Sequence, residues 1–134
     1  MFHYSFHARD LDEARRFYRG VLGCAEGRSA ESWVDFRFFG HQLSVHRGEP
    51  AKPSGTGSVD GIQVPMPHFG AVLSWDEFHA LARRVESAGV RFVVTPRVRY
   101  PGQIGEQATM FFLDPSGNAL EFKAFRRPEE VFAV

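Results

Sequence analysis

The sequence predicts an α+β fold in which two βαβββ modules form a curved, eight-stranded mixed sheet with a central cup and the helices outside. Residues 2–8 alternate aromatic with polar side chains, which is typical of a strand with one buried face. A stretch rich in Gly, Pro and Ser at 47–63 divides the chain nearly in half, and the order of elements before it recurs after it. A ferredoxin-like sandwich would contain the same elements, but the internal repeat favours the paired modules.

The first module is expected to begin with the strand at 2–8 and to continue into a helix. Asp10 is a candidate N-cap, apolar residues follow it at helical spacing, and Gly23 ends the helix. Strands are then expected at 33–38 and 42–46, where apolar and polar residues alternate again.

The second module repeats this order. Residues 68–73 form a predicted strand, and Ser74 with Glu77 three residues later makes a capping box before an apolar helical stripe that ends at Gly89. The remaining predicted strands and the hairpin turn between the last two are 90–96, 109–113, 119–125 and the turn 114–118.

We therefore expect a single domain, with no second folding unit beyond the repeat. Its parts are the first module (1–50), a linker (51–66), the second module (67–125) and a C-terminal tail (126–134). The tail is polar and then ends in apolar residues, so we expect it to dock on the body of the protein or on a second subunit. A homodimer is the expected assembly.

Composition excludes several classes of function. Lys+Arg and Asp+Glu each total 16, and this balance argues against a nucleic-acid binder that works by neutralising phosphates. No apolar run approaches the roughly 18 residues of a membrane span, and the N-terminus does not resemble a signal peptide. The lone Cys24 excludes an internal disulfide and a cysteine-based zinc site. A cytoplasmic protein acting on a small molecule is the simplest expectation.

Three polar side chains are expected to point into the cup, namely His3, His68 and Glu121. The two histidines occupy equivalent positions of the repeat, and Glu121 lies between Leu120 and Phe122 on the polar face of the last strand. A carboxylate is costly to bury there without a partner. Two imidazoles and one carboxylate would hold a divalent ion with open positions, which suits Fe(II) best and also Mn(II), Ni(II) or Zn(II).

Structural roles for the same residues stay open at this point. His3 could be a solvated residue near the N-terminus, and His68 could be a hydrogen-bonded core histidine. Glu121 could pair with one of the 14 arginines of the chain.

Further residues are candidates for contact with a substrate in the cup. Gln42, Ser44 and His46 share one face of a strand, which the repeat turns inward. His46 could deprotonate a bound hydroxyl, or it could only cap the strand end. Tyr100 and Gln103 lie in a loop that could cover the cup and donate hydrogen bonds to a substrate, or that could be plain surface.

The chain resembles the vicinal oxygen chelate superfamily, which includes glyoxalase I, fosfomycin-resistance and bleomycin-resistance proteins, and extradiol dioxygenases. The resemblance covers nearly the whole chain and is most specific at 112–122, where the sequence Gly-Asn-x-x-Glu places the family's carboxylate ligand at Glu121. Further segments similar to a group labelled as predicted extradiol-type dioxygenases are 23–24, 33–36, 68–70 and 106–112.

The resemblance implies a metal site made of His3, His68 and Glu121. Glyoxalase I has a fourth, carboxylate ligand in its first repeat, whereas the equivalent residue here is Ser44, which favours three protein ligands. The implied function is that of a metal-dependent, dioxygenase-like oxidoreductase acting on a small substrate that chelates the ion through vicinal oxygens. The alternatives are a metal-free protein that sequesters a drug-like ligand and a glyoxalase-like lyase or isomerase.

Overall fold

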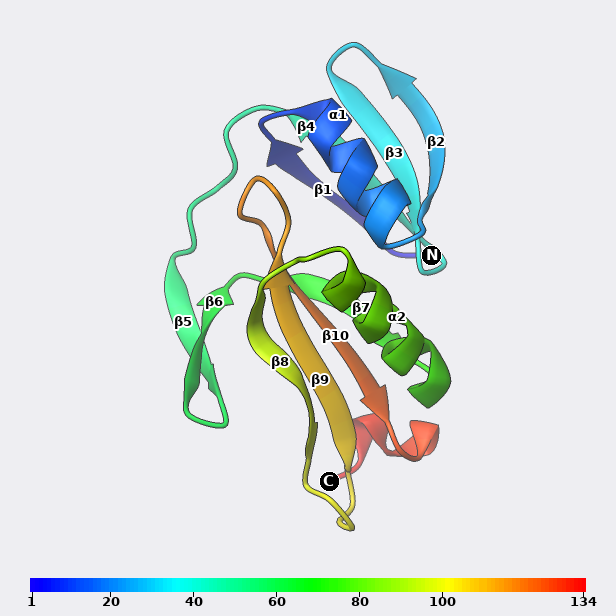
Figure 1. Cartoon of the computed structure of the whole chain (residues 1–134), viewed down its shortest axis with the longest axis vertical. Helices are drawn as coiled ribbons and strands as arrows, with labels where there is room; N and C mark the ends of the chain where they lie inside the picture. Colours follow the sequence, from blue (N-terminus) through cyan, green and yellow to red (C-terminus); the bar gives the residue numbers. More distant parts are fainter. The chain divides into compact units, whose positions relative to one another are not determined.

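Eight of the ten strands form two four-stranded mixed sheets, one in each half of the chain (Figure 1). In this computed structural model, which describes residues 1–134, the strand orders are β1-β4-β3-β2 and β7-β10-β9-β8. The first and last strands of each module pair in parallel, and the other pairs are antiparallel. The predicted α+β class and the two βαβββ modules are confirmed, with hydrogen bonds joining the eight strands as two sheets of four.

The first compact unit comprises residues 1–52 together with the turn 114–118. Its elements are β1 (His3–Ala8), α1 (Leu11–Arg15) with its π-helical continuation (Arg16–Val21), β2 (Ala25–Ala30), β3 (Trp33–Phe38) and β4 (His41–Arg47). The second unit comprises residues 53–113 and 119–134. Its elements are β5 (Gly55–Val59), β6 (Ile62–Met66), β7 (Phe69–Leu73), α2 (Trp75–Ser87), β8 (Phe92–Arg99), β9 (Gln107–Leu113), β10 (Ala119–Phe125) and a 3₁₀ helix (Pro128–Phe132).

The helix of the first unit begins as its sequence predicts and buries a tyrosine. Asp10 caps α1 by accepting a hydrogen bond from the backbone N–H of Glu13. One turn after α1, Tyr18 is fully buried, and its hydroxyl donates to Asp114 Oδ2 at 2.9 Å. Asp114 also accepts hydrogen bonds from the backbone of Ser116 and Asn118, so the predicted turn is fixed by its own aspartate and tied to the helix.

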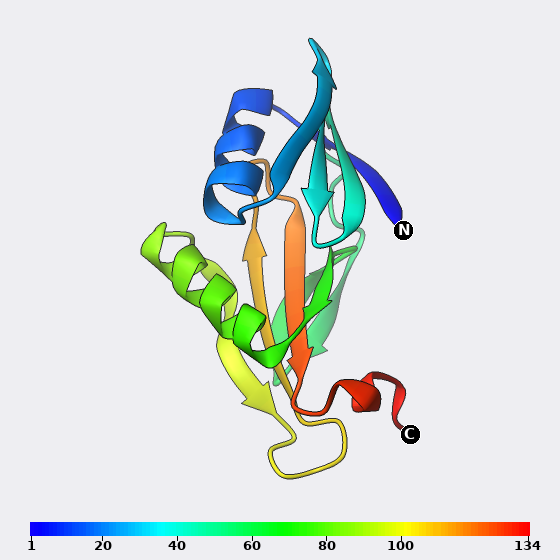
Figure 2. The same ribbon diagram turned by 90° about the vertical axis from the view of Figure 1, so that its right-hand side faces the viewer.

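The helix of the second unit covers one face of its sheet (Figure 2). Ser74 and Glu77 form the predicted capping box, with each side chain satisfying the other residue's backbone N–H. Phe78, Leu81 and Val85 are buried on the apolar side of α2, where the helix packs on β9 and β10. No helix of the chain has the length and hydrophobicity that crossing a membrane requires.

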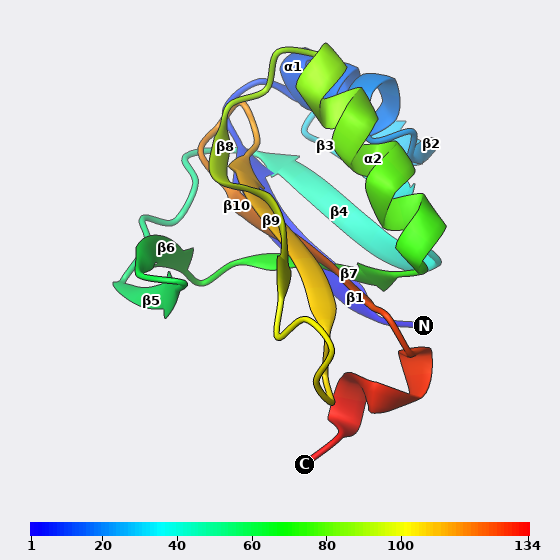
Figure 3. The ribbon, with the colours of Figure 1, turned by 60° about the horizontal axis from the view of Figure 1, so that its bottom comes forward.

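The segment expected to be a linker contains a β-hairpin, β5–β6. Its turn is Asp60-Gly61, where both residues have positive φ, at 49° and 80°. An Asp-Gly pair between two short strands is a strong hairpin signal, which the low apolar content of this stretch obscures. Val59 and Val64 pack against Val94 and Phe111, so the hairpin covers the sheet face opposite α2 (Figures 2 and 3).

One glycine sets how closely β7 approaches β10. Gly70 pairs with Glu121 in the parallel register, and a Cβ on residue 70 would lie 1.5 Å from the Glu121 carbonyl oxygen. No side chain fits at that separation, and the obstacle is backbone rather than a movable side chain. The pairing that carries Glu121 therefore requires glycine at this position.

We expect Gly70→Ala to lower the free energy of unfolding by about 3 kcal/mol, because the added methyl must push two paired strands apart. Gly20→Ala is the matched control, since a Cβ there meets nothing within 4 Å and the residue lies in a helical segment. The control should stabilise the protein by up to about 1 kcal/mol. Urea unfolding of both variants measures this, and equal stability of the two would contradict the packing argument.

The buried tyrosine predicts how stability changes at high pH. Burial, reinforced by the Asp114 carboxylate, raises the pKa of Tyr18 well above its ordinary value. The unfolded chain loses this proton near pH 10 while the folded chain keeps it, so stability is lost as pH rises above about 10. In Tyr18→Phe the free energy of unfolding should fall less steeply above pH 10 than in the wild type, by about 1.4 kcal/mol per pH unit. The reason is that unfolding of the variant releases one proton fewer. Identical slopes in urea unfolding at pH 9–11 would contradict this account.

Candidate functional site

Two of the three predicted metal ligands lie in contact within the second unit. His68 directly precedes β7, and Glu121 lies on β10, the parallel partner of β7. The Nε2 atom of His68 is 3.1 Å from Oε2 of Glu121, and the two side chains are 21% and 12% exposed. The parallel pairing of the module's first and last strands therefore brings together residues that are far apart in the sequence.

The other oxygen of Glu121 is held by neighbouring side chains. The hydroxyl of Thr109 on β9 donates to Oε1 at 2.9 Å, and the ammonium of Lys123 lies 3.4 Å from the same oxygen. Thr109 and Lys123 are directly opposite each other in the antiparallel register, so their side chains share one face of the sheet. The carboxylate is thus fixed with Oε2 as the oxygen that faces His68.

His68 is oriented through its second ring nitrogen. Nδ1 lies 2.8 Å from the carbonyl oxygen of Pro65. Because a carbonyl oxygen only accepts hydrogen bonds, Nδ1 is assigned the proton, and in a neutral ring Nε2 presents its lone pair to Glu121. The ring also packs edge-on against Phe111, with 4.9 Å between ring centroids.

This donor pair fits a divalent metal ion. A nitrogen lone pair and a carboxylate oxygen 3.1 Å apart repel each other unless a proton or a cation is shared between them. Two ligands at right angles on an ion, each about 2.1 Å from it, would be about 3.0 Å apart. Metal-ligating histidines also typically donate their other N–H to a carbonyl or carboxylate, as His68 does. Imidazole with carboxylate suits Fe(II), Mn(II), Ni(II) and Zn(II).

One cavity adjoins this pair and a second does not touch it, and both are lined in part by Lys123. The smaller, of about 200 Å³, is lined by His68, Glu121, Lys123 and residues of β7. The larger, of about 400 Å³, lies beyond Lys123 and is lined by Gln107 among others. The larger of the two is within the range of volumes typical of sites for small molecules.

The third predicted ligand, His3, lies in the first unit. It begins β1, is exposed, and has Gln42 on β4 as its neighbour in the register. Within either unit, no three His, Cys, Asp or Glu side chains gather as a ligand set for a metal ion. The role of His3 as a third ligand stays a prediction.

Two predicted substrate contacts converge on a buried carboxylate that the sequence analysis missed. Ser44 Oγ donates to Asp35 Oδ1 at 2.6 Å, and Gln42 Nε2 donates to Asp35 Oδ2 at 3.1 Å. Asp35 is only 9% exposed and lies opposite Ser44 in the β3–β4 pairing. The sequence does indicate a buried carboxylate here, because Asp35 lies between Val34 and Phe36 just as Glu121 lies between two apolar residues.

The remaining predicted site residues are at the ends of strands and in a loop. His46 is half-buried near the end of β4, opposite Trp33 on β3. Tyr100 has a positive φ of 54°, lines the larger cavity, and accepts a hydrogen bond from Arg99. Gln103 is exposed, in a turn closed by its backbone N–H bonding to the Tyr100 carbonyl.

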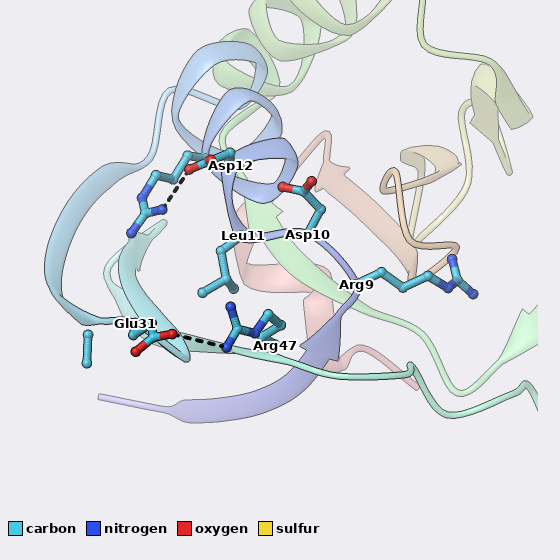
Figure 4. A pocket seen from close by; sticks show the side chains of 8 residues that line it. Arg9, Asp10, Leu11, Asp12, Glu31 and Arg47 are labelled. Carbon is cyan, nitrogen blue, oxygen red and sulfur yellow. Dashed lines mark hydrogen bonds and ion pairs between the residues drawn. The ribbon is translucent and has the colours of Figure 1, made fainter.

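A third cavity, of about 450 Å³, lies in the first unit where α1 begins (Figure 4). All of its charged side chains except Asp10 have ion-pair partners. Arg15 contacts Asp12 at 3.0 Å, and Arg47 contacts Glu31 at 3.8 Å, as the dashed lines in Figure 4 show. Arg9 also lines this cavity and pairs with an exposed glutamate, Glu49. None of the predicted site residues lines it.

Solved structures similar to this chain match nearly its whole length. A glyoxalase/bleomycin resistance protein/dioxygenase from Alicyclobacillus acidocaldarius is 32% identical, with a TM-score of 0.79 and coverage of 98% of this chain and 95% of that one. The fosfomycin resistance protein FosX of Listeria monocytogenes is 18% identical, with a TM-score of 0.72 and coverage of 97% and 95%. A lactoylglutathione lyase from Agrobacterium tumefaciens is 19% identical, with a TM-score of 0.63 and coverage of 100% and 96%. The last two show likeness of fold alone.

No curated protein matches the chain. The family model that describes the Glyoxalase/Bleomycin resistance protein/Dioxygenase superfamily matches residues 1–122, which is most of both modules. With the 32% identical structure, this match shows that the chain belongs to the glyoxalase/bleomycin resistance protein/dioxygenase superfamily.

Proposed function

We propose that the protein is a cytoplasmic, homodimeric, metal-dependent enzyme, a dioxygenase-like oxidoreductase for a small substrate with vicinal oxygens. The observation that carries this proposal is the facing of His68 Nε2 and Glu121 Oε2 at 3.1 Å, with each group oriented by its other polar atom. In a pair that only stabilised the fold, a proton would lie between the two groups, and in the proposed site the metal ion takes the place of that proton. Superfamily membership is consistent with catalysis and with ligand binding, and the chemistry of this pair supports catalysis.

In this proposal His68 and Glu121 hold the ion with His3 as the third ligand, and Fe(II) is the preferred metal over Mn(II), Ni(II) or Zn(II). When bound, the ion supplies Lewis acidity toward an oxygen of the substrate and, if it is iron, electrons for O₂. Thr109 and Lys123 keep the Glu121 carboxylate in place through Oε1. Phe111, packed on the His68 ring, excludes water from one side of the site.

The chain's other polar groups would bind the substrate and move its proton. His46 takes a proton from a substrate hydroxyl, because an imidazole accepts protons near neutral pH. Ser44 and Gln42, both fixed by Asp35, offer oriented polar atoms to the substrate. Tyr100 and Gln103 complete the set from the loop after β8.

Elemental analysis of protein purified without O₂ tests this function. We expect about one metal ion per chain in the wild type and none in Glu121→Gln, because the amide removes the anionic ligand. Glu129→Gln, at an exposed glutamate on the 3₁₀ helix, is the matched control and should keep its metal. Iron in the wild type would lead to O₂-uptake assays with catechols, whereas another metal would favour a lyase or isomerase.

Absence of metal from wild type and variant alike, even after reconstitution with Fe(II), would overturn the proposal. The protein would then be one that sequesters a small ligand without a metal. Unchanged metal content in Glu121→Gln would show that the ion binds elsewhere.

Thr109→Val tests whether the hydroxyl that holds Glu121 matters for metal binding. The valine keeps the shape of the side chain and removes the hydrogen bond to Oε1. We expect a 10–100-fold weaker affinity for the metal, which is the usual effect of losing a group that orients a ligand. Thr56→Val, at an exposed position of β5, is the control, and competition with a chelator measures both variants. Equal affinity in the two would contradict this role of Thr109.

A further inference from the structure

The face of the second sheet that carries Glu121 continues along β10 as a ladder of paired side chains. Glu121 is opposite Phe111, Lys123 is opposite Thr109, and the next pair on this face is Phe125 opposite Gln107. Directly opposed residues point to the same face, and successive same-face residues on a strand are about 7 Å apart. Lys123 is therefore one step from the candidate metal ligand, on the same surface.

Lys123 is one of only two lysines in the chain, and its one ion pair is with Glu121. A cation bound by Glu121 would compete with the ammonium for the same negative charge. On the other side of Thr109 in the register is Arg97, whose guanidinium bonds to the carbonyl and hydroxyl of Thr95 and to no carboxylate. Glu121 is the one carboxylate that pairs with either cation, because Glu130, which lines the larger cavity with Lys123, is bound to the Gly105 backbone N–H and to Arg127.

Lys123 also lies at the boundary of both cavities. One cavity is lined by Lys123 with His68 and Glu121, and the other by Lys123 with Tyr100, Gln107 and Glu130. In the second cavity Gln107 Oε1 is buried and has no hydrogen-bond partner. This oxygen could accept a hydrogen bond from a donor group of a ligand. A substrate that reached from the metal ligands past Lys123 would meet the ammonium first and then this amide.

We propose that the substrate is an acid, a vicinal-oxygen chelator that carries a carboxylate about one ring width from its chelating oxygens, and that Lys123 binds this carboxylate. This inference rests on the proposed function, because the chelating end is placed by His68 and Glu121. The carboxylate gives the ammonium a partner when Glu121 is engaged by the ion. The larger cavity receives any further substituent, with Gln107 as its hydrogen-bond acceptor.

Two diols that differ in a single group test the proposal. Catechol and 3,4-dihydroxybenzoate both chelate through vicinal oxygens, but only the second carries a carboxylate across the ring. Their affinities for the Fe(II)-loaded protein are measured by calorimetry without O₂, so that no turnover occurs. The proteins compared are the wild type, Lys123→Met and Lys52→Met, the last at the chain's other lysine, which is exposed.

We expect the wild type to bind the dihydroxybenzoate about tenfold more tightly than catechol, as a charge-assisted hydrogen bond allows. Lys123→Met should lose this preference, so that it binds the two diols with about equal affinity. Both affinities are measured at saturating Fe(II), with the bound iron determined in each protein, because Lys123 also contacts the Glu121 carboxylate. Lys52→Met should keep the preference.

Equal affinities in the wild type, or a preference that survives in Lys123→Met, would overturn the acid specificity and leave metal chelation standing. A wild type that binds neither diol would overturn the chelation function, and the inference with it.

Discussion

The candidate site depends on the parallel pairing of β7 with β10. This pairing closes the βαβββ module and brings residues 68 and 121 into contact across more than fifty positions of sequence. Gly70 makes the approach possible, since any side chain there would overlap the Glu121 carbonyl. The helix α2, which lies between the two residues in the sequence, packs on the opposite face, and the β5–β6 hairpin packs on Val94 and Phe111 of the face that carries Glu121.

Local signals in the sequence were enough to predict much of the fold. Three of these signals depend on contacts between residues a few positions apart, and the structure contains all three. They are the capping box at Ser74, the N-cap at Asp10 and the turn at 114–118. The hairpin β5–β6 was expected to be a linker because its strands contain few large apolar residues. Its stability comes from packing on Val94 and Phe111, which no local pattern reveals.

The candidate site could be predicted only in part. Alternation along the last strand placed Glu121 on the polar face, and the repeat indicated His68 as a candidate ligand. Their contact, however, depends on the register between β7 and β10. The roles of Thr109 and Lys123 as partners of Glu121 were missed for the same reason, because cross-strand neighbours are set by pairing and not by sequence distance. Asp35 was missed although it carries the same alternating signal as Glu121.

An anomalous difference map from crystals grown with Fe(II) under argon tests the central claim most directly. A peak within about 2.2 Å of both His68 Nε2 and Glu121 Oε2 is the predicted result. The same map would show whether His3 completes the site and from which copy of the chain. A map with no peak there, in which the imidazole and the carboxylate remain in direct contact at about the present 3.1 Å, would contradict the claim.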